Sequence, residues 1–227
     1  MAFTARSVIQ SAQATLQDAG GVRWLLPELL GYLNAGTREI ALQKPTATAV
    51  TTTISLASGT RQELPAGYHR LLSAIRNTGN GRAITPVVRE ILDMQIPGWH
   101  DTSVMPFNAV VAHVMDDPFD TSVFHVCPGN DGSGEIDVIM SRLPVPIPTP
   151  ANQLDIEAYS ADVQVPDIYE NCLVDYVCYR AFSKDINVAG AAQRAQAHYG
   201  LFQQALGIKA QIDMAQNVDT PKSRFSQ

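Results

Sequence analysis

The stretch that decides the fold is residues 166–184, PDIYENCLVDYVCYRAFSK. Pro166 suits the opening of a helix, and Asp167 and Glu170 suit its positively polarised first turn. Lys184 suits the negatively polarised last turn. Apolar side chains fall nearly all round the helix that these signals delimit. Such a helix must be covered on most sides, so the rest of the chain has to supply its neighbours.

A longer helix is predicted after it, from about Val188 to Gln216, because apolar residues recur on one face at alternating steps of three and four. Gly190, Gly200 and Gly207 interrupt this pattern. Each glycine weakens an isolated helix by about 1 kcal/mol relative to alanine. We therefore expect close approach of another backbone at these positions.

The start of the chain predicts a helical hairpin. Thr4 is a candidate N-cap for a first helix that ends at Gly20-Gly21. Pro27 fits an early position of a second helix, which Lys44-Pro45 stops. Apolar residues recur at three- and four-residue steps in both segments, so each helix has one face to bury.

The middle of the chain changes to a period of two, which is typical of strands. Val50, Thr52 and Ile54 fall on one face of a stretch rich in threonine. Further alternating runs occur at residues 70–76, 109–115, 122–127, 135–141 and 154–158. One short helix interrupts them within residues 87–95, before Pro97. This part predicts a small antiparallel sandwich or barrel.

The predicted fold class is α+β, with a four-helix bundle formed by the N- and C-terminal helices and an inserted antiparallel β-sandwich or barrel-like domain. The predicted parts are residues 1–45 for the helical hairpin, 46–160 for the β insertion, 161–216 for the C-terminal helices and 217–227 for a polar tail.

Three loop segments invite a functional interpretation. Residues 127–134 are rich in glycine but join two alternating runs with no helix after them, which favours a hairpin turn over a nucleotide loop. Residues 116–120 carry aspartates without the spacing of a calcium loop, which favours a solvated loop. Residues 143–150 have proline at every second position, which predicts an extended segment across a sheet edge or between subunits more than a ligand for a proline-binding partner.

Composition and charge exclude several classes of protein. The 227 residues are 45% apolar, enough for a proper core, and 16 basic against 22 acidic side chains give a net charge of −6. That sign disfavours a protein that grips nucleic-acid phosphates over a broad basic face. No apolar run approaches the roughly 20 residues of a membrane helix, and the first ten residues lack the order of a secretory signal. We expect a soluble, unexported protein.

No pattern in the sequence predicts catalysis. The three cysteines, Cys127, Cys172 and Cys178, are too few and scattered for a disulfide framework, and no histidine lies at metal-finger spacing from them. A nucleophile elbow, a phosphate loop with its lysine and a His-Glu-x-x-His motif are all absent. We expect buried reduced thiols, no metal, no cofactor and no enzyme.

Two segments resemble the head-tail adaptor (connector or neck) proteins of short-tailed bacteriophages. The first is residues 23–34, RWLLPELLGYLN, with the later Lys44-Pro45. The second is residues 173–185, LVDYVCYRAFSKD, whose Tyr-Arg-Ala and Ser-Lys-Asp elements are followed by Arg194-Ala195, His198-Tyr199 and Phe202. The β insertion fits the family as architecture alone.

The resemblance implies a structural component of the virion, made in the cytoplasm of the host bacterium. It implies a ring of twelve copies that binds the portal protein and carries the tail nozzle or tail tube. Genomic DNA would pass through the channel as transiting cargo, and no membrane is involved. The acidic balance suits such a channel, because it repels phosphates instead of holding them.

Particular residues become structural or interface candidates. Trp24 is expected to pack the second helix on the C-terminal pair, and Arg180 needs a partner, for which Glu28, Asp175 or a neighbouring subunit is available. We hypothesise a pair between Arg180 and Glu28, and docking of the tail on the portal. The full set of candidates is Trp24, Glu28, Arg180, Lys184, Asp185, Lys222, Arg224 and Phe225.

Two other functions stay open at this stage. One is a different structural part of a phage, such as a tail tube or completion protein. The other is a carbohydrate-binding or carbohydrate-hydrolysing β module that would use Asp116, Asp120, Glu135 and Asp137. Convergence of these acids in one cleft would favour the enzyme.

Overall fold

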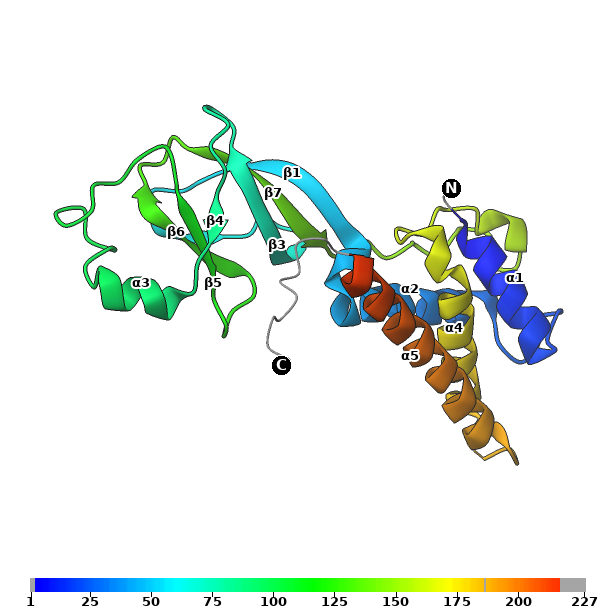
Figure 1. Cartoon of the computed structure of the whole chain (residues 1–227). Coiled ribbons are helices and arrows are strands. Elements are labelled where there is room, and N and C mark those ends of the chain that lie inside the picture. The colour runs from blue at the N-terminus through cyan, green and yellow to red at the C-terminus, as the bar shows by residue number, and fades with distance from the viewer. Residues whose placement is uncertain (1–2, 186, 217–227) are drawn as a thin grey trace, which may run out of the picture. The chain divides into compact units, whose positions relative to one another are not determined.

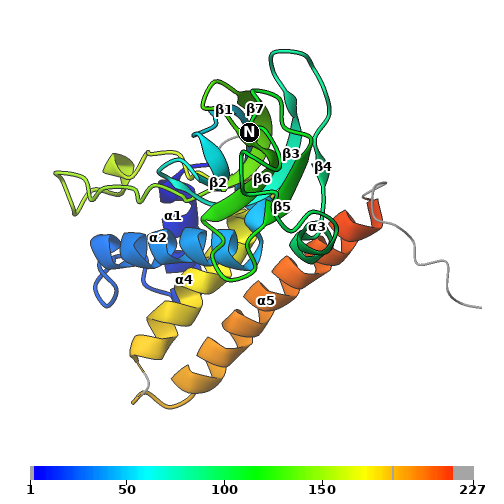
Figure 2. The ribbon, with the colours of Figure 1, turned by 90° about the vertical axis from the view of Figure 1, so that its left-hand side faces the viewer.

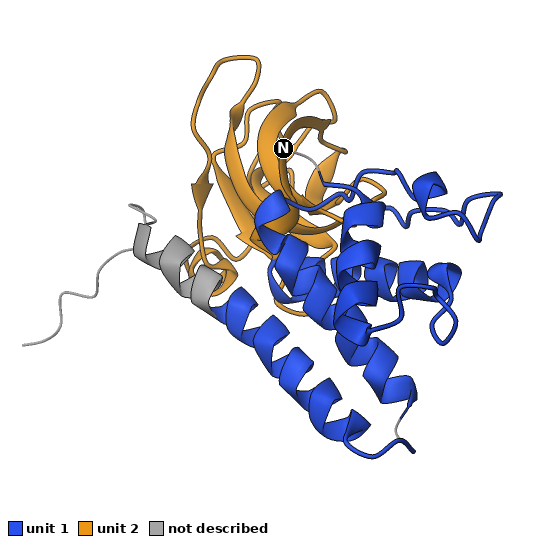
Figure 3. Ribbon diagram, turned by 90° about the vertical axis from the view of Figure 1, so that its right-hand side faces the viewer, with its two compact units in different colours: residues 1–44, 144–227 blue, residues 45–143 orange. Residues whose placement is uncertain are grey.

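A computed structural model describes residues 3–185 and 187–216, with side chains described as far as Gly207 (Figure 1). The chain divides into two compact units (Figure 3). Unit 1 consists of residues 1–44 and 144–227, and unit 2 of residues 45–143. Unit 1 is therefore built from both ends of the chain, and residues 144–160, assigned above to the β insertion, lie in it.

Unit 1 contains the helices α1 (Ala5–Leu16), α2 (Leu26–Gln43), α4 (Glu170–Lys184) and α5 (Ala191–Gln216), with short 3-10 turns at Ile156–Ala158 and Asp167–Tyr169. Thr4 caps α1, because its hydroxyl accepts a hydrogen bond from the amide of Ser7 at 3.3 Å. Pro27 lies in the first turn of α2, and Lys44 follows its last residue. The predicted helical hairpin is confirmed in these details, but α1 ends at Leu16 and not at Gly20-Gly21, because Gln17 adopts the left-handed conformation that closes the helix.

Helix α4 is the centre of unit 1, since it packs against α1, α2 and α5. α4 and α5 lie side by side and run in opposite directions (Figure 2). Leu173, Val177, Cys178 and Ala181 are completely buried, whereas one side of the helix around Arg180 is exposed. The expectation of cover nearly all round is thus wrong for that side. A bundle in which all four helices share one core stays a prediction.

Close helix approach occurs at a glycine that the sequence analysis did not single out. A methyl group at Gly36 of α2 would lie 2.9 Å from the side chains of both Leu173 and Tyr176 of α4. The prediction for Gly190, Gly200 and Gly207 is wrong, because no described atom of another element lies within 4 Å of the position that a Cβ would take at any of them.

The proline-alternating segment 143–150 begins at Leu143, the last residue of unit 2, and its residues 144–150 belong to unit 1, where they contact α2. The amide side chain of Asn34 bonds both the N–H and the C=O of Ile147, each at 2.9 Å. The N–H of Val145 donates to the side-chain oxygen of Gln164 at 3.2 Å. The N–H groups of Val145 and Ile147 are therefore satisfied by side chains, whereas that of Leu143 donates to the carbonyl of Gly67 at 2.8 Å. Residues 144–150 lie against α2 and not across a sheet edge, and the alternative position between subunits stays a prediction.

Unit 2 contains two sheets and one helix, α3 (Arg89–Gln95). The first sheet has the order β1-β7-β3, from β1 (Ala49–Ser55), β7 (Glu135–Arg142) and β3 (Tyr68–Asn77). The second has the order β2-β6-β5-β4, from β2 (Gly59–Glu63), β6 (Val123–Asn130), β5 (His113–Asp116) and β4 (Thr85–Pro86). Pairing is antiparallel except between β4 and β5. The α+β class is confirmed, and the sheets do not close into a barrel.

The core of unit 2 has two parts. One cluster takes buried apolar residues from both sheets, including Ile136 and Val138 of β7 and Phe124 and Val126 of β6. A second cluster joins Leu92 of α3 and the completely buried Trp99 to Met115 and Cys127 of the four-stranded sheet. The predicted short helix is therefore confirmed, and it contributes to this second cluster.

The glycine-rich segment 127–134 is not a hairpin turn. Cys127–Asn130 belongs to β6, whereas β7 lies in the other sheet, so the segment carries the chain from one sheet to the other. The buried Asn130 holds this crossing: its side-chain NH₂ donates to the carbonyls of Asn108 and Ala109, and its side-chain oxygen accepts from the amides of Gly132 and Gly134. Two further corrections concern residues 154–158, which form no strand, and β2, which was not predicted.

Candidate interaction site

The loop between α1 and α2 is organised by one carboxylate. Asp18 accepts hydrogen bonds from the amides of Val22, Arg23 and Trp24 at 3.0, 2.9 and 2.9 Å. Burial acts against the charged form, but these backbone hydrogen bonds outweigh it and lower the pKa of Asp18. The loop is thus fixed in the conformation that presents Trp24 to α4.

Trp24 packs on the end of α4. It is 4% exposed, its indole N–H donates to the carbonyl of Ala181 at 3.2 Å, and its ring meets that of Phe182 edge-on at 6.2 Å. Next to it, Arg23 stacks on the Trp24 ring at 5.0 Å and forms an ion pair of 2.7 Å with Asp185. These contacts tie the start of α2 to the end of α4.

Glu28 pairs with Lys184 and not with Arg180. Its two carboxylate oxygens lie 2.7 and 2.8 Å from the ammonium of Lys184, and the hydroxyl of Tyr32 donates to it at 2.7 Å. Burial acts against the charge of Glu28, but the hydrogen bonds from Lys184 and Tyr32 lower its pKa. Burial and the bond to Glu28 raise the pKa of Tyr32 to about 12.

Arg180 has a different neighbour from the one that the sequence analysis assigned. Its guanidinium lies 5.6 Å from the centroid of the Tyr32 ring. Because Arg180 is exposed, the assumption that it must be neutralised in an apolar setting is wrong. The hypothesised Arg180–Glu28 pair is therefore replaced by the pair of Glu28 with Lys184, with Tyr32 between Glu28 and Arg180.

Sequence reasoning missed Asp18 and Tyr32. Both stand at signals that could have identified them: Asp18 precedes a glycine pair, and Tyr32 lies four residues after Glu28 on the same helix face. It also missed the pair of His198 on α5 with Asp175 on α4, 2.9 Å apart. Lys222, Arg224 and Phe225 lie outside the described residues.

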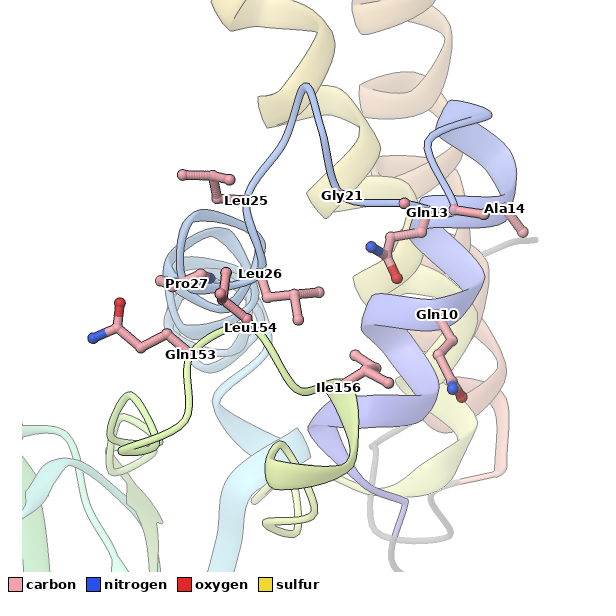
Figure 4. A pocket seen from close by; sticks show the side chains of 12 residues that line it. Gln10, Gln13, Ala14, Gly21, Leu25, Leu26, Pro27, Gln153, Leu154 and Ile156 are labelled. Carbon is pink, nitrogen blue, oxygen red and sulfur yellow. The ribbon is translucent and has the colours of Figure 1, made fainter.

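A cavity of about 490 Å³ opens beside this junction (Figure 4). Gln10 and Gln13 of α1, the start of α2 and the segment 153–156 surround it. Of the apolar side chains that line it, Leu25 and Leu154 are 55% and 87% exposed. Exposed apolar side chains gathered about one hollow are typical of a protein-binding surface.

The acids considered for a carbohydrate site are spread over two sheets. Glu135 and Asp137 lie on β7, whereas Asp116 ends β5 and Asp120 lies in the loop beyond it. Arg76 and Thr53 bond Asp137 and lower its pKa, and Ser122 does the same for Asp120. Of the four, Asp116 has its pKa raised, by burial. This distribution does not form the cleft of perturbed carboxylates that such an enzyme needs.

The part of the chain that the structure describes contains neither a metal-binding cluster nor a membrane-spanning helix. Within residues 3–185 and 187–207, no three histidine, cysteine or acidic side chains gather as a metal site would require. In the same part of the chain, none of the helices combines the length and the apolar character needed to cross a bilayer.

Comparison with known proteins supports the resemblance that residues 23–34 and 173–185 carry. No curated protein matches the chain. The model of the SU10 adaptor protein family matches residues 3–223, which includes both segments, their junction and the β unit between them. As the resemblance to phage head-tail adaptors implied, the chain belongs to the SU10 adaptor protein family, a family of phage structural proteins.

Proposed function

We propose that this chain is the head-tail adaptor of a short-tailed phage, a ring component that docks on the portal and provides the platform for the tail nozzle or tail tube around the DNA channel. The observation that carries the proposal is the family match over residues 3–223 together with the junction of the two segments that resemble head-tail adaptors. Twelve copies are expected from the same resemblance.

The helical unit is suited to such a contact. A rigid junction, held by Trp24 and by the pair of Glu28 with Lys184, stands beside the cavity whose rim is apolar and exposed. An adaptor needs a surface of this kind, because stable association buries apolar groups at its centre. The net charge of −6 suits copies arranged about a passage for DNA.

Electron microscopy of the protein mixed with the portal ring of the same genome tests the proposal, with each protein alone as a control. We expect a ring of additional density beneath the portal, in which each copy contributes a helical layer and a β lobe. Absence of that density, with the protein free in both samples, would refute portal docking while leaving family membership intact.

A variant sharpens this experiment. Leu25→Ser and Leu154→Ser replace exposed side chains at the cavity rim, so they should leave the free energy of unfolding within about 0.5 kcal/mol of wild type. If the rim meets the portal or a neighbouring copy, the double variant will form fewer rings. Val104→Ser is a matched control, since Val104 is 58% exposed but belongs to unit 2.

A further inference from the structure

Strand β1 presents a free row of backbone groups. It stands at the edge of the β1-β7-β3 sheet. The amide of Leu56 donates to the carbonyl of Gly134 at 2.9 Å, which sets the alternation along the antiparallel pair. Val50, Thr52 and Ile54 therefore direct their backbone groups toward β7. The backbone groups of Thr51, Thr53 and Ser55 point to the open edge, and among the described residues β7 is the strand paired with β1.

The other edge strands, β2, β3 and β4, have charged residues, irregular pairing or proline, which discourage pairing with a further strand. β1 has none of these features. β2 has the charged residues Arg61 and Glu63 and a bulge, β3 has three register shifts, and β4 is two residues long and includes Pro86. β1 is seven residues long, AVTTTIS, without charge or proline, and its register with β7 is unbroken. Five of its residues are exposed. An edge of this kind is a ready template for another strand.

The pattern of β1 is complementary to itself. Reversed about Thr52, it places Thr51 opposite Thr53, Val50 opposite Ile54 and Ala49 opposite Ser55. The hydroxyl groups of Thr51 and Thr53 then face each other on one side of the sheet, and the apolar Val50 and Ile54 face each other on the other side, where the two Thr52 residues also meet. The same register sets residues with outward backbone groups opposite one another, so Thr51 and Thr53 of the two strands can exchange both hydrogen bonds.

We propose that β1 is a strand-addition site for β1 of a second copy of this chain, paired antiparallel about Thr52. The two three-stranded sheets become one continuous sheet of six strands. Two acids of β7 face β1. Asp137 is held by Arg76 and Thr53 at 2.8 and 2.7 Å, and Glu135 lies opposite Ser55 at the end of the strand, where the hydroxyl of Ser55 lies 3.5 Å from it. Neither acid belongs to β1 itself, so no two acids face each other directly across the new pairing.

The contact has two-fold symmetry and uses the same strand on both copies. A head-to-tail ring joins two different surfaces, so the strand-paired dimer is a state of the free protein and not a pair of neighbours in the ring. It goes beyond the proposed function and can fail or succeed independently of portal docking.

Disulfide cross-linking of full-length single-cysteine additions tests the register. At the two-fold centre, the two Thr52 residues form a non-hydrogen-bonded pair, in which the Cα atoms lie about 4.5 Å apart, within disulfide reach. Thr52→Cys should therefore give a covalent dimer under mild oxidation. Thr51→Cys is the matched control, because position 51 faces position 53 and not itself. The native thiols of Cys127, Cys172 and Cys178 are buried.

Sedimentation equilibrium of the full chain tests the contact itself. Thr51→Pro removes an outward N–H at an edge position where proline is tolerated, and Thr51→Val changes the side chain but keeps the N–H. We expect a wild-type dimer, a dimer dissociation constant raised at least about tenfold by Thr51→Pro, and little change for Thr51→Val. Thr51→Lys supplies a second edge-blocking variant if circular dichroism shows that Thr51→Pro is misfolded.

Three results would overturn the proposal. The first is a wild-type protein that is monomeric at every concentration and does not cross-link through Thr52→Cys. The second is a dimer that neither Thr51→Pro nor Thr51→Lys weakens, which would place the contact elsewhere. The third is equal cross-linking by Thr51→Cys and Thr52→Cys, which would exclude the register.

Discussion

Glu28 connects the two segments that carry the family resemblance. It lies in the first turn of α2, where a negative charge suits the helix dipole, and it reaches Lys184 in the last turn of α4, where a positive charge suits the opposite end. Each side chain thus stabilises its own helix as well as the other side chain. The pair is partly exposed, so its strength depends on the solvent around it.

Replacement of this carboxylate should weaken unit 1 in a pH-dependent way. We expect Glu28→Gln to lower the free energy of unfolding by about 1 kcal/mol at pH 7, near the upper end for such pairs. The pKa of Glu28 is lowered in the folded protein, so its contribution is present above the ordinary carboxyl pKa of about 4.3 and is lost as the pH falls through the folded value. Urea unfolding of wild type and variant at pH 7 and in acid measures both effects.

Charge exchange provides the control for this prediction. Glu28→Lys and Lys184→Glu should each destabilise the protein, and the double variant should recover part of the loss. Arg180→Gln, four residues from Lys184, should cost less than Glu28→Gln because Arg180 is exposed and stacks on Tyr32. A larger loss from Arg180→Gln would contradict the pairing of Glu28 with Lys184.

The sequence alone does not show whether Glu28 pairs with Arg180 or with Lys184. Arg180 and Lys184 are four residues apart, so they share one helix face, and either could reach a carboxylate on α2. What decides between them is the position of α2 along α4, which depends on close packing at Gly36 and on the anchoring of Trp24. The sequence predicted that the two helices meet, but the partner of each charge followed from their packing.

Helices α2 and α4 approach closely at a position that has no sequence signature. Gly36 and Gly31 both lie on α2, and both look alike in the sequence. Gly36 is buried against Leu173 and Tyr176, whereas Gly31 is exposed, and no described atom lies within 4 Å of the place that a methyl group would take there. The difference lies in the helix face, because five residues correspond to about 1.4 turns.

Alanine substitution at these two glycines should give opposite results. Gly36→Ala forces a methyl group against α4, so we expect a loss of about 1–3 kcal/mol despite the better helix propensity of alanine. Gly31→Ala meets nothing and should gain up to about 1 kcal/mol. Thermal unfolding measures both, and a gain at Gly36 would mean that the two helices are further apart than described.

The sequence predicts where most of the strands lie but not which sheet each strand joins. Alternating runs correctly placed β1, β3, β6 and β7, because side chains on one face of each enter a core. They did not reveal that β6 and β7 belong to different sheets. A short glycine-rich link looks the same whether the strands pair or separate, and here the buried Asn130 and the crowded Gly134 decide.

On the scale of the whole molecule, unit 2 is formed by one continuous stretch of chain, whereas unit 1 is formed by two separate stretches. Unit 2 is one uninterrupted stretch, residues 45–143, with its own apolar clusters. Unit 1 needs both ends of the chain, since α4 packs on α1 and α2. The overall α+β organisation was predictable because the change from a period of 3.6 to a period of two, and back again, is visible in the sequence.

Fragments should behave accordingly. Residues 45–143 expressed alone should give a well-dispersed proton–nitrogen NMR spectrum, because the unit has its own core. Residues 144–227 alone should give the narrow dispersion of an unfolded or molten chain, because Leu173 and Tyr176 lose their cover from α2. Folding of the second fragment by itself would contradict the central role assigned to the contacts of α4.

The split of unit 1 also sets an order of events on the ribosome. Helices α1 and α2 are synthesised first, but the helix against which they pack is made after the whole of residues 45–143. At bacterial translation speeds near the upper end of roughly 5–20 residues per second, a hundred residues take about 5 s, and four times longer at the lower end. During that interval α2 can pack against α1 but lacks α4, while unit 2 can already fold. The nascent chain is therefore open to chaperone binding at the face of α2 around Gly36, which meets Leu173 and Tyr176 of α4 only when synthesis is nearly complete.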